Sequence, residues 1–325
     1  MAAPLVSVVT PFYNTADYLA ECIESVLRQS YGNWEYVLVN NCSTDGSLQI
    51  AQRYASRDAR IRLHSNEQFL GQVENYNHAL SLAATGSKYC KLVEADNWLY
   101  PECLERMVDM AERHPEVGIV SAYYLKGAVV VGGADQPGAE VYAGREVCRE
   151  KLLAGGFYTG SPTSVMYRGD IVRSRRPFYA LGRRHEDRDV VYEILEHHAL
   201  GFVPQILCYL RTGNPSILTA ARPFDPGVLD RLLEIELYAD RFLTPEEARR
   251  VRRNARTQYF EFMGRSVLKL QPRAFWQFHF RGLRTIGWNP PYLRIAAAAL
   301  WQAAELILNP LDAVRRVSRA VRARL

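Results

Sequence analysis

The chain has 325 residues, of which 48% are hydrophobic, 11% aromatic and 23% charged. These proportions are typical of a folded globular protein, and they exclude a disordered tail, a collagen-like repeat and a small disulfide-rich scaffold. The formal net charge of +5 hides a division, because residues 1–220 carry 21 Lys and Arg against 25 Asp and Glu, whereas residues 221–325 carry 19 against 10.

The first 120 residues alternate between strand and helix patterns. Short β-branched runs predict strands, and amphipathic runs with a period near 3.6 residues predict helices. In chain order the pattern predicts strands over 5–10, 34–39, 61–64, 89–93 and 118–123, separated by helices over 18–29, 47–56, 73–84 and 101–114. Strands that alternate with helices predict an α/β fold with a mostly parallel sheet flanked by helices.

The rest of the chain changes character in two steps. Residues 127–144 are rich in glycine and small side chains, which predicts a hairpin or a mobile loop. Helices are predicted over 147–153, 190–197, 228–242, 245–270, 272–286, 291–308 and 310–325. Thr244, with Glu247 three residues later, is typical of a capped helix start. We therefore expect one domain over 1–220 and a helical, basic C-terminal region over 221–325.

Polar side chains follow three of the predicted strands. The segments are Thr10-Pro11-Phe12-Tyr13-Asn14, Asn40-Asn41-Cys42-Ser43-Thr44-Asp45-Gly46-Ser47 and Glu94-Ala95-Asp96-Asn97-Trp98. Ligands bind at the carboxyl ends of the strands in such sheets, so the sequence predicts a site built from these three loops. Taken alone, the second segment is also explained by a capped helix start and the third by an acidic turn.

In order and spacing, these segments resemble the opening of the family 2 inverting glycosyltransferases, which have the GT-A fold. The resemblance covers about residues 5–220 and continues through Asn66 to Gly71 and through VEADNWLYP. It implies a Rossmann-like sheet whose residues 1–120 bind a nucleotide-diphosphate sugar and whose residues 121–220 receive a glycan or lipid-linked glycan. The implied donor contacts are Pro11, Tyr13, Asn14, Asn41, Ser43, Asn77, Glu94 and Ala95.

The acidic segment after residue 93 resembles the metal site of that family. By this resemblance Asp96 is the direct ligand of Mn²⁺ or Mg²⁺, and Glu94 stands where the family commonly has Asp. Residues two apart in an extended segment point to the same face, so both carboxylates can hold one ion. Such a cation prefers oxygen ligands and neutralises the diphosphate as the glycosidic bond breaks.

A larger departure from the family follows the second strand, where this chain has Asn40-Asn41 in place of two Asp. The second Asp of the family usually accepts the N3–H of uracil. The Asn41 amide oxygen can still accept, but without a charge the hydrogen bond is weaker. A UDP-sugar remains the favoured donor, and the base stays open.

The pair Glu186-Asp187 resembles the acidic pair of the family at the start of a helix. The resemblance implies that Asp187 deprotonates the acceptor hydroxyl and that a single displacement inverts the anomeric carbon. Glu186 is the alternative base or an acceptor-binding carboxylate. Acidic residues in a first helical turn are also explained by the helix dipole alone.

Further residues are assigned to the acceptor or to the donor phosphates. They are Ser161, Thr163, Arg183, Arg184 and Arg211. The serine and threonine belong to a Gly-Ser-Pro-Thr-Ser segment that resembles an acceptor-side loop. Guanidinium groups suit phosphate oxygens, although a solvated basic loop is the other interpretation of the arginines. The family often has His where this chain has Gly213.

The C-terminal region is strongly basic, with 16 Lys and Arg against 3 Asp and Glu from residue 248 onward. Its last helices combine apolar residues, Trp301 and clustered arginines, which is typical of a helix at a membrane interface. We expect a cytoplasmic protein attached peripherally to the inner face of the cytoplasmic membrane. A helical bundle packed on the first domain is the alternative, and nucleic acid is not an expected partner.

Three other features limit the function. The six cysteines are scattered without a Cys-x-x-Cys pair, which predicts reduced thiols, and no apolar stretch reaches the ~20 residues that span a bilayer. The first residues read as a strand and not as a signal peptide.

A non-catalytic nucleotide-sugar-binding or membrane-associated scaffold protein is the rival function. A nucleotidyltransferase is disfavoured, because residues 10–14 are neither glycine-rich nor basic. The oligomeric state is left open.

Overall fold

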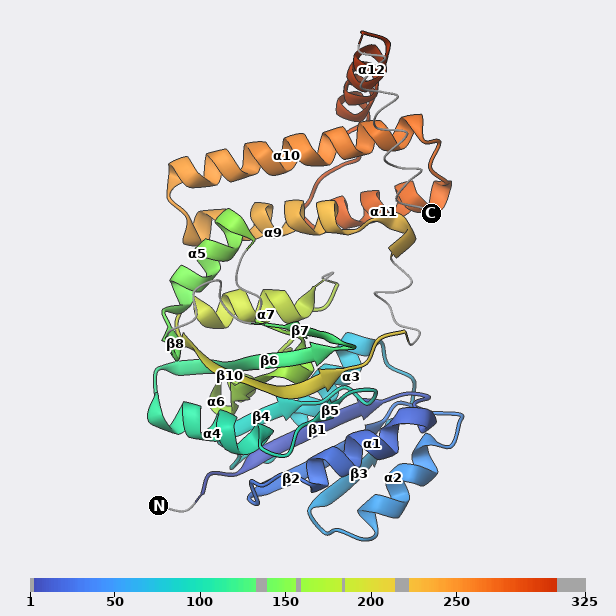
Figure 1. Ribbon diagram of the computed structural model, residues 1–325. Helices are drawn as coiled ribbons and strands as arrows, with labels where there is room; N and C mark the ends of the chain where they lie inside the picture. The colour runs from blue at the N-terminus through green and yellow to red at the C-terminus, as the bar shows by residue number, and fades with distance from the viewer. Residues whose placement is uncertain (1–2, 133–138, 156–158, 183–184, 214–221, 309–325) are drawn as a thin grey trace. The chain divides into compact units, whose positions relative to one another are not determined.

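The computed structural model describes residues 3–132, 139–155, 159–182, 185–213 and 222–308. The chain divides into two compact units, Met1–Asn214 and Pro215–Leu325. The first is a mixed α/β unit with a central sheet and the second is helical (Figure 1). The α/β fold class predicted from the sequence is therefore confirmed.

The first unit begins with a regular alternation of strands and helices, close to the one predicted. Its elements up to the first hairpin are β1 (Val6–Phe12), α1 (Ala16–Leu27), β2 (Trp34–Asn40), α2 (Ser47–Ala55), β3 (Ile61–Ser65), α3 (Gln72–Ser81), β4 (Tyr89–Leu92), β5 (Trp98–Leu99), α4 (Cys103–Arg113) and β6 (Val117–Lys126). The later ones are β7 (Val129–Val131), β8 (Val141–Tyr142), α5 (Gly144–Ala154), η1 (Pro162–Ser164), β9 (Val165–Arg168), α6 (Gly169–Ser174), α7 (Glu186–Leu195) and β10 (Ala199–Leu210).

The described strands form one sheet in the order β3-β2-β1-β4-β9-β6-β10-β5, with β7 on β6 and β8 on β10. The pairs β3-β2, β2-β1, β1-β4 and β6-β10 are parallel. Strand β9 lies antiparallel between β4 and β6 and separates the two parallel groups. The carboxyl ends of β1, β2 and β4 consequently meet at one edge of the sheet, where the sequence placed the site.

Three strands, the two-residue β5 and the longer β9 and β10, were not among the predicted elements. Strand β9 has only four residues, too few for a clear pattern. In β10 the inward-facing pattern is broken around Pro204 and Gln205, where its register against β6 shifts and the residues are exposed. Proline removes a backbone donor and is tolerated in strands at such irregular points. These strands make the sheet mixed.

Strand β1 is covered on both faces, which explains its continuous apolar run. All seven of its residues are buried. Val6 and Val8 join a core with α1 and α4, whereas Val9 faces the other way, toward the side on which α3 packs. Figure 1 shows helices on both sides of the sheet. A strand that is buried on both faces is apolar along its length, whereas a half-buried strand alternates apolar and polar residues.

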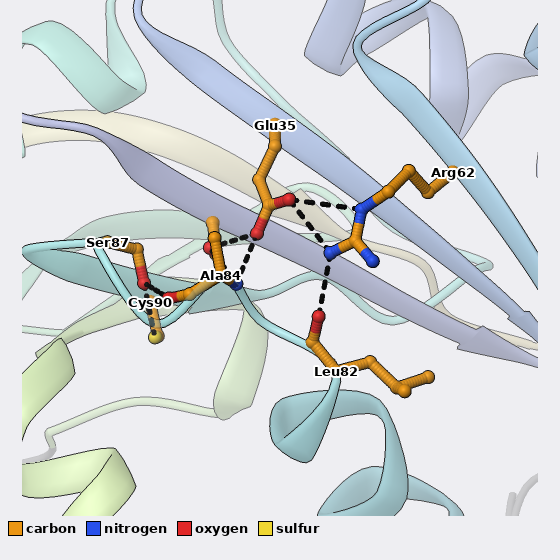
Figure 2. Close-up of polar contacts among 7 residues, drawn as sticks. Glu35, Arg62, Leu82, Ala84, Ser87 and Cys90 are labelled. Carbon is orange, nitrogen blue, oxygen red and sulfur yellow. Dashed lines mark hydrogen bonds and ion pairs between the residues drawn. The ribbon is translucent and has the colours of Figure 1, made fainter.

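A polar network holds the strand ends opposite the candidate site (Figure 2). Glu35 of β2 accepts hydrogen bonds at Oε1 from the hydroxyl of Ser7 and from the backbone N–H of Ala84, both at 2.5 Å. Its Oε2 binds the guanidinium of Arg62 at 2.8 Å, and the same guanidinium donates to the Leu82 carbonyl at 2.7 Å. One carboxylate thus ties β1, β2 and β3 to the loop that leads into β4.

Replacing Glu35 with alanine should lower the free energy of unfolding by about 2–3 kcal/mol. The change leaves the part-buried Ala84 N–H with only the longer hydrogen bond to the Ser7 hydroxyl, at 3.2 Å, and removes the charge-assisted bonds from Arg62. Urea denaturation measures the loss. Glu116→Ala, at a side chain that is 57% exposed, is the control and should stay within about 0.5 kcal/mol. Equal stability of the two variants would contradict this role.

The second unit contains η2 (Arg222–Phe224), α9 (Gly227–Phe242), α10 (Pro245–Leu268), α11 (Arg273–Arg284) and α12 (Tyr292–Leu308). The Thr244–Glu247 capping box predicted at the start of α10 is confirmed. Helices α10 and α12 approach closely at Gly264, because a Cβ there would lie 2.9 Å from that of Ala298. Among the residues described, no helix has the length and apolar character needed to cross a bilayer. The helix predicted over 310–325 lies outside the described residues.

Candidate functional site

The turns after β1 and β2 are locked together. Asn14 and Cys42 both have left-handed backbone conformations, with φ of 50° and 59°. The Asn14 backbone N–H donates to the Ser43 hydroxyl at 3.1 Å, and its Oδ1 accepts the Thr44 N–H at 2.8 Å. Residues other than glycine are uncommon in this conformation and often mark functional sites. Two of the predicted donor residues, Asn14 and Ser43, are therefore hydrogen-bonded to each other and fix the two turns at this edge of the sheet.

An aromatic pair stands exposed beside these turns. Tyr13 is 46% exposed and Phe69 59%, and their ring centroids lie 4.8 Å apart in an edge-to-face arrangement. Pro11, another predicted donor contact, is instead buried within β1 and paired with Val39 of β2. Sequence reasoning missed Phe69, although a large apolar residue in a polar loop was a signal for it.

Two predicted donor-binding asparagines, Asn41 and Asn77, form hydrogen bonds with other parts of the chain. The Asn41 Oδ1 accepts from the Asn66 amide at 3.0 Å and from the Leu70 N–H at 2.9 Å, and its Nδ2 donates to the Leu70 carbonyl at 2.8 Å. Asn77 exchanges two hydrogen bonds of 2.8 Å with the backbone of Tyr179. Both amides tie loops to the sheet, so the Asn41 oxygen expected to meet uracil already accepts two hydrogen bonds.

Glu94 makes several side-chain hydrogen bonds at the site. Its oxygens accept hydrogen bonds from the hydroxyl of Tyr76 at 3.1 Å, the amide of Asn97 at 3.0 Å and the hydroxyl of Thr163 at 3.1 Å. The Thr163 hydroxyl also accepts the Glu94 backbone N–H at 3.0 Å. Thr163, expected on the acceptor side, is thus a direct partner of the acidic segment.

The carboxyl groups of Asp96 and Asp187 both lie within electrostatic reach of Glu94. Burial and, after it, the charges of Asp96 and Asp187 together raise the pKa of Glu94 to about 7. The structure therefore brings Asp187 of α7 near the segment that follows β4, although 91 residues (187 − 96) separate the two Asp in sequence. Ala95, between the two acids, is buried.

The donor set suits a hard divalent cation. Mg²⁺ and Mn²⁺ prefer carboxylate oxygens, and Mg²⁺ is commonly held by one or two of them together with substrate phosphates. Asp96 and Glu94 supply two carboxylates, and the described residues contain no group of three or more His, Cys, Asp or Glu able to hold a metal. The shared negative charge that raises the pKa of Glu94 is what a bound cation neutralises.

Arg211 lies against the acidic segment from the end of β10. Its Nε donates to the backbone carbonyl of Asp96 at 3.1 Å, and its guanidinium pairs with Glu21 of α1 at 2.5 Å. The guanidinium carbon lies 4.6 Å from the ring centroid of Tyr18 and 5.2 Å from that of Trp98. Arg211, predicted to bind the acceptor or phosphate, stabilises in this structure the loop that carries Asp96.

The acceptor-side segment is fixed by a buried lysine that sequence reasoning missed. Lys91 of β4 is fully buried, and its ammonium donates to the carbonyls of Thr163 at 2.6 Å and Val165 at 3.1 Å. Gly160 has φ of 105° and no room for a Cβ, which would meet the Ser164 hydroxyl. The Ser161 hydroxyl is buried and makes no hydrogen bond within the described residues.

The acidic pair lies in the first turn of α7, as predicted. The Asp187 Oδ1 accepts the Arg188 N–H at 2.9 Å. Burial and, to a smaller extent, the charge of Asp187 raise the pKa of Glu186 to about 7. Arg183 and Arg184, assigned to phosphate or acceptor binding, lie outside the described residues. The described acids of this site are therefore Glu94 and Asp96 after β4 and Glu186 and Asp187 at the start of α7.

Comparison with known proteins adds to this geometry. The model of glycosyl transferase family 2 matches residues 7–175. Putative glycosyltransferase EpsE of Bacillus subtilis is 31% identical over 220 residues, which are 64% of this chain and 73% of that protein.

Two solved structures share the fold. S. aureus TarS 1-349 in complex with UDP-GlcNAc aligns with a TM-score of 0.60 at 20% identity, over 86% of this chain and 79% of that one. Mannosyltransferase PcManGT from Pyrobaculum calidifontis, in complex with GDP-Man and Mn²⁺, aligns with a TM-score of 0.53 at 16% identity, over 98% and 84%.

Proposed function

Since the chain belongs to glycosyl transferase family 2 and is a glycosyltransferase, we propose that it transfers a sugar from a nucleotide-diphosphate donor to a glycan or lipid-linked glycan, with inversion. The electrostatic coupling of Glu94, Asp96 and Asp187 carries this proposal. This coupling supports a site in which Glu94 and Asp96 hold a metal ion and Asp187 acts as the base on the same substrate. Residues 1–120 would bind the donor and residues 121–220 the acceptor.

Asp96 is the proposed direct ligand of Mn²⁺ or Mg²⁺, with Glu94 beside it. A bound divalent cation supplies positive charge that stabilises the diphosphate leaving group. The hydrogen bonds from Tyr76 and Thr163 hold the Glu94 carboxylate in place for this. Arg211 braces the backbone of Asp96. A PcManGT complex with GDP-Man and Mn²⁺ supports metal use by the fold.

A UDP-sugar is the favoured donor, and we place its base against the exposed pair of Tyr13 and Phe69. Aromatic rings offer large apolar faces to a nucleobase, and these two stand at the turn after β1 and in the loop before α3. The neighbouring turn formed by Asn14 and Ser43 fits the ribose or the diphosphate. Asn41 and Asn77 then contribute indirectly, by holding the Leu70 and Tyr179 backbones.

Asp187 is the proposed general base. Its carboxylate takes the proton of the acceptor hydroxyl as that oxygen bonds to the anomeric carbon, and the bond from this carbon to the diphosphate oxygen breaks on the opposite face. One displacement of this kind inverts the anomeric configuration. The buried Ser161 hydroxyl is a candidate to orient the acceptor.

A donor screen followed by product analysis tests the reaction. The purified protein is incubated with each nucleotide sugar and Mn²⁺, and the released nucleotide is measured. Proton NMR of the transferred sugar then gives its anomeric configuration, which should be opposite to that of the donor. Retention would contradict a single displacement.

We also propose that the acceptor is met at a membrane surface, with the protein peripheral on the cytoplasmic face. Helix α12 exposes Leu293 (88%), Leu300 (73%) and Trp301 (72%). An exposed apolar stripe with nearby arginines is typical of a helix at a bilayer interface. The partner proposed for this stripe is an anionic bilayer, because the sequence after it, 309–325, adds five arginines against one aspartate.

Replacing Leu300 and Trp301 together with serine should reduce co-sedimentation with phosphatidylglycerol vesicles by about tenfold or more, since two large apolar side chains leave the interface. A truncation after Pro290 would also remove α12, but Ile295 and Ala299 of that helix are buried, so the truncation would remove packing contacts as well. The double substitution changes exposed side chains only. Val129→Ser with Val130→Ser, at exposed positions of β7, is the control. Equal sedimentation of both double variants and the wild type would remove α12 from membrane binding.

A further inference from the structure

A basic groove lies between α10 and α12, within the second unit. It has a volume of about 670 Å³ and is open to solvent. Five arginines line it: Arg249, Arg252, Arg253, Arg256 and Arg294. Four of them project from α10, where spacings of three and four residues place side chains on one face of a helix. The fifth comes from α12.

The five arginines fall into two classes. Arg252 and Arg256 already pair with carboxylates, Arg252 with Asp240 at 2.6 Å and Arg256 with Glu236 at 2.7 Å. Arg249, Arg253 and Arg294 are exposed and form no ion pair in the parts of the chain that the structure describes. Glu261 of α10 also lines the groove, where it lies 3.9 Å from Arg265, so these three guanidinium groups outnumber the one further carboxylate and leave the groove with a net positive charge.

The walls of the groove are partly apolar. Phe260 of α10 lines it, and the guanidinium carbon of Arg294 lies 5.6 Å from its ring centroid. Ala297 and Ala298 of α12 add small apolar surface. A ligand that fits this surface has an anionic head for the guanidinium groups and an uncharged part for the phenyl and methyl groups.

We propose that this groove is a binding site for a phosphate-bearing ligand, held by Arg249, Arg253 and Arg294, with its uncharged part against Phe260. Phosphate suits the groove because guanidinium groups bind its oxygens in bidentate pairs, and its two negative charges can balance several arginines. Free polyphosphates and phosphate headgroups of lipids share this chemistry. The site goes beyond the glycosyl transfer proposed above and does not depend on it.

Calorimetric titration with inorganic pyrophosphate tests the site. The full chain keeps Asp96 and the buffer contains EDTA, so that no divalent cation holds pyrophosphate at the proposed donor site. Arg249→Gln with Arg253→Gln should weaken pyrophosphate binding by about tenfold or more, because charge-assisted hydrogen bonds are lost. Both side chains are exposed, so the fold should survive.

Arg250→Gln with Lys269→Gln is the matched control. Both residues are exposed, one within α10 and one at its C-terminal cap, neither lines the groove, and the change in charge is the same. This control should alter the affinity less than about twofold, apart from the general electrostatic effect that added salt screens. Identical losses in the two double variants, or no loss in either, would overturn the site.

Vesicles distinguish the two sources of phosphate. If the ligand is a lipid headgroup, phosphatidylglycerol vesicles should compete with pyrophosphate in the control variant and bind less to Arg249→Gln/Arg253→Gln. If the ligand is a free polyphosphate, pyrophosphate binding falls in that variant while vesicle binding stays as in the control. Each result supports a phosphate site, and the titration alone decides whether the groove binds phosphate.

Discussion

Asp187→Asn should reduce sugar transfer by about 10²- to 10⁴-fold, the usual effect of removing a general base. The asparagine amide keeps the size of the side chain and can still accept the Arg188 N–H that now reaches Oδ1 at 2.9 Å. It cannot take the proton of an acceptor hydroxyl. We therefore expect kcat to fall while metal-dependent donor binding, measured by calorimetry, remains within about twofold of the wild type.

Glu186→Gln separates the two members of the acidic pair. If Asp187 is the base, this variant should keep most of the transfer rate. If Glu186 is the base, Glu186→Gln should reduce the transfer rate by the 10²- to 10⁴-fold expected above for the loss of a base. The wild-type rate should then also rise with pH through about 7, because burial has raised the pKa of Glu186 to that value. Asp109→Asn, on the exposed face of α4, controls for the change in net charge. Unchanged turnover in Asp187→Asn would remove that residue from the mechanism.

Asp96→Asn should abolish the dependence of donor binding on Mn²⁺ and reduce transfer by about 10²- to 10³-fold. A cation at a developing phosphate charge contributes several kcal/mol to the transition state, and each 1.4 kcal/mol is a factor of about ten. Calorimetry with UDP, with Mn²⁺ or with EDTA, measures the binding, and nucleotide release measures the rate.

The EDTA arm is the internal control for Asp96→Asn. Without metal, the variant should bind UDP at least as well as the wild type, because the aspartate charge that repels the diphosphate is gone. A folding defect would instead weaken binding in both arms. Persistence of the gain in affinity with Mn²⁺ would show that Asp96 is not the ligand.

Much of the fold and the positions of the acidic residues followed from local patterns. The buried runs of β1 and β2, the amphipathic α1 and the Thr244–Glu247 capping box depend on neighbours within a few residues, and these were predicted correctly. The order of the polar segments identified the family. Strands β9 and β10 were missed because their sequences are too short or interrupted, and their pairing partners are distant in sequence.

The contacts that shape the site were decided by the tertiary structure. Lys91 and the carbonyl of Thr163 are 72 residues apart, and Arg211 lies 115 residues from the Asp96 carbonyl to which it donates. Local pattern cannot indicate such pairs, because a buried polar group takes whichever partner the fold brings near. The same is true of Asn41, whose amide was expected to meet the donor and is instead bonded to Leu70. The amino-acid sequence by itself determined the chemical groups and the edge of the sheet where they gather. Only the packing of distant segments decided which of those groups remain available to substrate and which hold the site in place.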